Sequence, residues 1–191
     1  MKLHCEFRGA LVLLVALLLA ACGKSQFGWT EEVQLASGDV IVVKRTVKSQ
    51  SLGEIGGPGG WESEAMTLEV IQPQAPDNPA VWNFPFVPVV FDRDPETKEW
   101  FVVATFYTCE RWHELGKPKL PYAEWRFRSG QWQRVELASE HVGRKANMLT
   151  AISSEGEPNH TLKSKEEIMS DRRIAIEYRQ IYPGWHRLSC S

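Results

Sequence analysis

Side chains able to do acid–base or metal chemistry are scattered along this sequence and form no motif. His113 and Glu114 are adjacent, but Lys117 stands where a metalloprotease helix needs its second histidine. The other histidines share no zinc-ligand spacing, and no Gly-x-Ser-x-Gly nucleophile motif occurs. The sequence therefore predicts no catalytic residue, no metal site and no cofactor.

Cys22, in contrast, stands where covalent chemistry is expected, because it ends an unbroken apolar run over residues 10–21. Lys2 and Arg8 precede the run, which gives the basic and apolar regions of a secretory signal. The run is too short to cross a bilayer as a helix, which takes about 20 residues. We therefore expect residues 1–21 to be a signal peptide that is removed.

The four residues Leu19-Ala20-Ala21-Cys22 resemble the lipobox of bacterial lipoproteins. In proteins with this signal, the cysteine sulfur receives a diacylglyceryl group, the chain is cut before the cysteine, and the new amine is acylated. The resemblance covers about the first 22 residues. It implies lipidation of Cys22, of the kind that palmitate labels, and a membrane as partner through the N-terminal lipid. An ordinary secretory signal cut after Ala21 is the alternative.

Residues 22–28 are expected to be a short lipidated tether, and residues 29–191 a single β-rich domain. The six residues after Cys22, 23–28, reach only about 20 Å when fully extended, so the domain would lie close to the membrane. Enteric lipoproteins kept at the inner membrane carry an aspartate after the lipidated cysteine, whereas Gly23 stands there in this chain. The resemblance therefore implies the periplasmic side of the outer membrane of a bacterial cell envelope.

Two thiols are left once Cys5 is removed with the signal and Cys22 carries lipid. These are Cys109 and Cys190, and in an oxidising compartment an isolated pair is most simply a disulfide. Two free buried cysteines are the alternative. The bridge would close a long loop, and the chain-entropy model gives it about 4–5 kcal/mol of stabilisation.

The charge balance bears on the class of partner. Lys and Arg number 22 against 24 Asp and Glu, a net charge of −2, and removal of the signal leaves the chain near neutral. A nucleic-acid-binding domain normally carries a strongly basic surface, so no nucleic-acid partner is expected.

Alternating apolar residues and turn signals predict hairpins through most of the chain. The expected strands are 32–36, 40–43, 66–71, 84–91, 100–107, 125–128 and 131–135. Both faces of 100–107 are apolar, so we place the 86–107 hairpin at the centre of the fold. Pro85 and Pro88 favour an edge position or a bulge.

The turn at Ser129-Gly130 gives the clearest hairpin. It predicts that Phe127 pairs with Trp132 and that Trp125 pairs with Arg134, with the guanidinium lying over the indole.

Near the C-terminus, Ser164-Lys165-Glu166-Glu167 is typical of a capping box that starts one helix or two short ones running to about Gln180. The expected fold is therefore mainly β. Antiparallel hairpins form a sandwich or a partly open barrel, with a short C-terminal helical segment.

Eight tryptophans are spread over the chain, and most are expected to fill the core. Trp112 is the exception, because with His113 and Glu114 it stands in a polar connection that also contains Tyr122, which suits a binding surface. We therefore expect a non-catalytic envelope lipoprotein with a binding or structural role and a protein or a glycan as its partner. An envelope hydrolase with an unrecognised active site is the alternative, and a pocket joining His113 to His141 or His160 would favour it.

Overall fold

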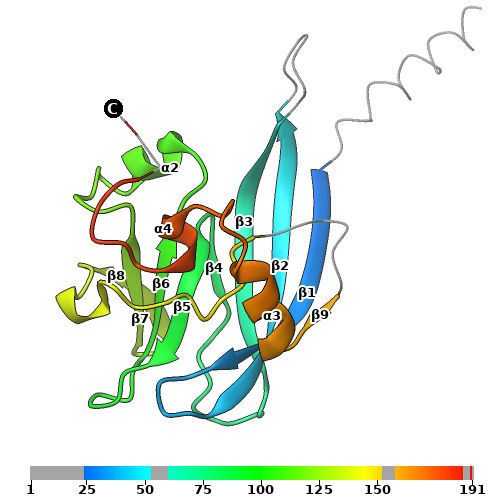
Figure 1. Ribbon diagram of the computed structural model, residues 1–191. Coiled ribbons are helices and arrows are strands. Elements are labelled where there is room, and N and C mark those ends of the chain that lie inside the picture. The colour runs from blue at the N-terminus through cyan, green and yellow to red at the C-terminus, as the bar shows by residue number, and fades with distance from the viewer. Residues whose placement is uncertain (1–23, 53–59, 152–157, 187–189, 191) are drawn as a thin grey trace, which may run out of the picture.

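Two β-sheets packed face to face form the core of the computed structural model, which describes residues 24–52, 60–151, 158–186 and 190 (Figure 1). The expected signal peptide at residues 1–21 and Cys22 lie outside the described residues. The first sheet has the strand order β4–β3–β2–β1–β9, namely β1 (Lys24–Gln34), β2 (Val40–Leu52), β3 (Gly60–Gln72), β4 (Trp82–Phe84) and β9 (Asn159–His160). The second has the order β5–β6–β7–β8, namely β5 (Val87–Arg93), β6 (Trp100–Thr105), β7 (Ala123–Arg128) and β8 (Gln131–Val135).

Neighbouring strands run antiparallel except for the two-residue parallel pairing of β9 with β1. The fold is a β sandwich with short helices near the C-terminus, which confirms the predicted class. β1 begins earlier than the sequence suggests. Residues 24–28, expected to belong to the tether, pair with residues 46–50 of β2 because the long second strand offers them a ladder.

Four short helical segments complete the described chain: α2 (Cys109–Glu114), the 3-10 turn η1 (Ser139–His141), α3 (Leu162–Met169) and α4 (Ile176–Arg179). None of the helices within the described ranges is long and apolar enough to cross a bilayer. The helical segment expected up to about Gln180 consists of two short helices, α3 and α4, which was one of the two expected alternatives. Its cap is Thr161 and not Ser164, because the Thr161 side chain accepts the Ser164 N–H at 3.3 Å and places Ser164 at the third helical position.

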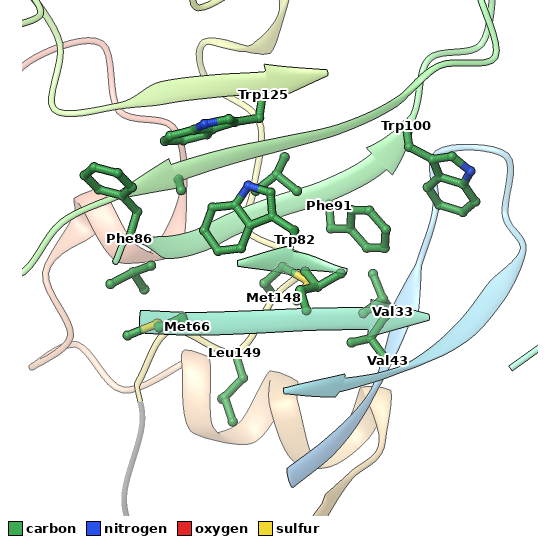
Figure 2. Close-up of a cluster of buried hydrophobic side chains, with 14 of the residues drawn as sticks. Val33, Val43, Met66, Trp82, Phe86, Phe91, Trp100, Trp125, Met148 and Leu149 are labelled. Atoms are coloured by element: carbon green, nitrogen blue, oxygen red, sulfur yellow. The ribbon is translucent and has the colours of Figure 1, made fainter. Parts of the chain in front are cut away.

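The chain crosses between the sheets at Pro85 and Phe86, which join β4 to β5. Tryptophan rings fill the space between the sheets at this crossing, as Figure 2 shows. Trp82 and Trp125 pack edge to face with centroids 5.6 Å apart, and Phe86 lies 5.2 Å from Trp125. The aromatic core expected from the composition is therefore centred on residues from β4 and β7.

The β5–β6 hairpin is as central as its sequence predicts, because all six residues of β6 are buried. β5 is an edge strand, and its register shifts between Pro88 and Val90. Proline cannot donate to the ladder, so the edge position and the irregularity both accommodate Pro88.

The β7–β8 hairpin has the predicted register, with Phe127 opposite Trp132 and Trp125 opposite Arg134. Arg134 makes no cation–π contact with Trp125 among the described residues, because aromatic side chains from β4 and the crossing already surround that indole. The exposed guanidinium of Arg134 is left facing solvent.

Substitutions at Gly130 test the turn that fixes this register. Ser129 and Gly130 have φ values of 51° and 78°, as a type I′ turn requires. A Cβ at Gly130 meets no atom within 4 Å, so the cost of a side chain there is backbone strain. We expect Gly130→Val to lower the free energy of unfolding by about 1–3 kcal/mol in a urea titration. Gly130→Asn, which tolerates the left-handed region, should lose less. An unchanged midpoint for Gly130→Val would contradict the turn.

Candidate functional site

Helix α2 carries three of the four residues predicted to form a binding surface. Trp112 is half-buried, its indole N–H donates to the Pro118 carbonyl at 3.1 Å, and its ring packs edge to face against Trp185 at 5.7 Å. His113 and Glu114 are exposed on the same helix. This part of the predicted surface is therefore brought together at one place.

Tyr122 occupies a different environment. Only 2% of its surface is exposed, and its hydroxyl accepts the Tyr182 N–H at 2.9 Å while lying 2.9 Å from the Gln180 carbonyl. Burial raises the pKa of this phenol. The hydroxyl therefore holds the C-terminal segment in place, and only the side of the ring is available to a neighbouring groove.

Cys109 and Cys190 are joined in the structure by a disulfide, with Cα atoms 5.4 Å apart, within the range that such a bridge needs. The bridge attaches Cys190 to the first residue of α2. Trp112, Lys117, Lys119, Trp185 and Cys190 line a hollow of about 330 Å³, which we call the Trp112 pocket. The disulfide therefore closes one wall of this pocket.

Mass spectrometry of a non-reducing digest should find a peptide that links Cys109 to Cys190. We expect Cys190→Ser to lower the free energy of unfolding by about 2–5 kcal/mol. Because one bridge is lost in either case, the double variant Cys109→Ser/Cys190→Ser should be no less stable than Cys190→Ser alone. Two alkylatable thiols in freshly isolated, unreduced protein would contradict the bridge.

A second hollow, of about 600 Å³, opens between residues 115–122 and the end of β8. We call it the edge groove, because it lies beside the outermost strand of the second sheet. Its apolar lining comes from Leu115, Leu120, Ala123, Val135, Leu137 and Val142. Pro118 and Lys119 line both the edge groove and the Trp112 pocket, so residues 115–122 form the ridge between two adjoining hollows.

Glu31 is fully buried within the first sheet. Its carboxylate lies 2.8 Å from Nη1 of Arg45 and 2.7 Å from Nζ of Lys165, and it accepts the Leu149 N–H at 2.8 Å. Burial acts to raise the pKa of Glu31, but the charges of Lys165 and Arg45 and these hydrogen bonds bring it below its ordinary value. The cluster pairs one carboxylate with two cations and joins β1, β2 and α3.

Removing the Glu31 charge leaves Arg45 and Lys165 buried without an anion. We expect Glu31→Gln to lower the free energy of unfolding by about 3–5 kcal/mol. Glu69→Gln, on the exposed face of β3, is the matched control and should change stability little.

The same pair of variants gives a pH test. The pKa of Glu31 is lower in the fold than its ordinary value of 4.5, so its contribution is fully present above about pH 4.5. That contribution is lost as the pH falls through the folded-state pKa. Urea titrations over this range should show wild type losing its advantage over Glu31→Gln. A constant difference down to low pH would show that Glu31 is not the group that titrates.

Glu124 forms a second buried ionic cluster in the other sheet. Its carboxylate lies 3.0 Å from Nδ1 of His141 and 2.8 Å from Nε of Arg126, and it accepts the Ala138 N–H at 3.0 Å. The pKa of Glu124 lies below its ordinary value. Burial acts to raise this pKa, but the hydrogen bonds from His141, Ala138 and Arg126 outweigh it. Phe101 stacks on the His141 ring at 4.3 Å.

A histidine hydrogen-bonded to a carboxylate is the arrangement that orients a catalytic base. Within the described ranges, however, no serine, threonine or cysteine side chain is hydrogen-bonded to His141. Neither the Trp112 pocket nor the edge groove defined above is lined by a histidine. His113 lies on α2 and His160 on β9 of the other sheet, so the structure does not bring either to His141.

Both ionic clusters were missed by motif reasoning, although the strand pattern carries a signal for the first. Glu31 and Arg45 stand at inward positions whose neighbouring inward residues in the same strands are apolar, such as Val33 and Val43. Charges at inward positions of two adjacent strands indicate a buried pair. Lys165 is remote in sequence and gives no such signal.

In the part of the chain that the structure describes, no three His, Cys, Asp or Glu side chains gather as a metal-ligand set. No protein-family model matches the chain, and no curated protein or solved structure matches it either.

Proposed function

We propose that this protein is a lipid-anchored lipoprotein of a bacterial envelope with a non-catalytic binding role. The observation that carries the proposal is the apolar run over residues 10–21 that ends on Cys22. β1 begins at Lys24, so a lipid on Cys22 would hold the first sheet within two residues of the membrane attachment. With Gly23 after the cysteine, the proposed location is the periplasmic side of the outer membrane.

The proposed binding surface is the Trp112 pocket together with the adjoining edge groove. Binding in place of catalysis is supported by how the ionisable clusters are used. Glu31 is paired with Arg45 and Lys165 inside the fold, and Glu124 is held by His141 and Arg126. An envelope protein or a glycan is the proposed partner.

An envelope hydrolase is the second candidate, and the His141–Glu124 hydrogen bond is the observation in its favour. Against it, only 6% of the His141 surface is exposed and one face of the ring is covered by Phe101. The binding role agrees better with this geometry. Loss of a hydrolytic activity of the purified protein in His141→Ala would favour the hydrolase.

Palmitate labelling in the native host tests the anchor. We expect Cys22→Ser to abolish the label and to release the protein from the membrane or leave it unprocessed. Cys5→Ser is the matched control, because that thiol lies within the signal, and it should label as wild type does. A labelled Cys22→Ser variant would overturn the lipobox interpretation.

A pull-down of the lipidated protein from its own envelope tests the binding role. We expect a bound protein or glycan whose recovery falls when Trp112 or Lys119 is replaced by alanine. Recovery that is unchanged by both substitutions would place the binding surface elsewhere.

A further inference from the structure

β8 is the outermost strand of the second sheet, and one side of its backbone faces away from β7. The two-residue turn makes Arg128 and Gln131 the first hydrogen-bonded pair of the hairpin, so Gln133 is the next residue of β8 to bond β7. Trp132 and Arg134 therefore direct their backbone N–H and C=O groups to the free side. In the described chain, none of these four groups has a backbone partner.

The opposite edge of the same sheet is closed by the chain itself. The Asn147 side-chain amide pairs with Phe91 of β5, accepting its N–H at 3.0 Å and donating to its carbonyl at 2.8 Å. The backbone N–H groups of Asn147 and Met148 both point to the Val89 carbonyl, at 3.2 and 3.3 Å. Asn147 and Met148 thus occupy the edge at β5 in place of a further strand, while the edge at β8 keeps its backbone hydrogen-bonding groups available.

The edge groove adjoins this open edge and has apolar residues on both faces of the sheet. Leu115 and Ala123 belong to the core between the two sheets. Leu120, Leu137 and Val142 pack with the cluster on the outer face. Because successive side chains of a strand point to opposite faces, an added strand would place apolar side chains against both groups.

The charges at the groove favour an acidic residue in the occupant. Lys119 and Arg134 are exposed at its rim, and neither forms an ion pair with another described residue. Glu136 is the one carboxylate among the groove's lining residues. The groove therefore presents an excess of positive charge beside its apolar lining.

The neighbouring tryptophans favour a peptide over a glycan. Sugars stack on open indole faces, but Trp112 and Trp185 pack edge to face at 85°. Their indole N–H groups are both engaged with backbone carbonyls, of Pro118 and Lys119. The recognition groups left at this surface are an open backbone edge, apolar pockets and basic side chains.

We propose that β8 docks an extended segment of a partner protein as an additional strand. The segment pairs with the backbone of Trp132 and Arg134, lays successive apolar side chains against both apolar groups of the edge groove, and places an acidic residue near Lys119 and Arg134. This inference rests on the binding role proposed above and names the class of partner.

A pair of substitutions at Arg134 separates backbone pairing from charge. Arg134→Pro removes the outward N–H but no hydrogen bond to β7, and proline is tolerated on a strand edge. Arg134→Ala removes the charge and keeps the N–H. The probe is a seven-residue peptide library displayed on phage and selected on the lipidated protein in detergent, followed by fluorescence anisotropy with the selected peptides.

We expect selected peptides to contain successive apolar residues and to carry an acidic residue. Arg134→Pro should weaken their binding by tenfold or more, about the worth of one lost hydrogen bond with its geometry. Arg134→Ala should weaken it by no more than about fivefold. Equal losses in the two variants, or a selection that returns no binding peptide, would overturn the proposal.

Hydrogen exchange gives a readout that needs no variant to fold. The Trp132 and Arg134 amides should exchange quickly in the free protein and become protected when a selected peptide is bound. Peptides that bind without protecting either amide would overturn strand addition. If peptidoglycan fragments bind the wild type and Arg134→Pro equally and no peptide does, the surface is a glycan site. That result would support the proposed binding role and overturn strand addition at β8.

Discussion

A carboxylate inside a β-sheet requires cations that the sheet must obtain from elsewhere in the chain. Glu31 obtains one from the neighbouring strand, through Arg45, and one from α3, through Lys165. Lys165 also donates to the Glu32 carbonyl at 2.7 Å, so one ammonium group bonds both the side chain and the backbone of β1. The helix is thereby fixed to the sheet by a polar contact that tolerates little displacement.

The same requirement explains how the first sheet is covered. At the β4 end of the first sheet, Trp82 packs against Trp125 of the second sheet. On its other side, β1 lies three strands away from β4 in the sheet order, outside the Trp82–Trp125 contact. Leu149 covers part of that side, and its N–H is bonded to Glu31 while its side chain belongs to the core. α3 lies over the same side in Figure 1. The polar cluster therefore orders the segment that completes the apolar core.

Local patterns predicted the hairpins well, and the cysteine count predicted the Cys109–Cys190 bridge. Long-range polar contacts, such as that of Lys165 with Glu31, were not predicted. The Ser129-Gly130 turn fixed a register that the structure reproduces pair by pair, because two-residue turns leave no freedom in strand alignment. Pro88 marked an edge strand with an irregular register for an equally local reason. The tether was assigned too many residues, since the pairing of residues 24–28 depends on the length of β2 and not on their own composition.

The candidate site was predictable only in part. Trp112 was identified because it stands in a polar connection, which suits a binding surface, and the structure gives it a pocket with Cys190 and Trp185. The position of Tyr122 depends on the carbonyl of Gln180, which no local pattern reveals. The open edge of β8 is a property of sheet order, so it became visible only once the last strand of the sheet was known.

The amide of Asn147 joins the two sheets through a single nitrogen atom. Its Nδ2 donates to the Phe91 carbonyl in β5 and to the Gln34 carbonyl at the end of β1, at 2.8 and 3.0 Å. Deamidation would exchange that nitrogen for an oxygen and turn both contacts into repulsions between acceptors. Deamidation of Asn147 would therefore weaken one of the polar links between the two sheets.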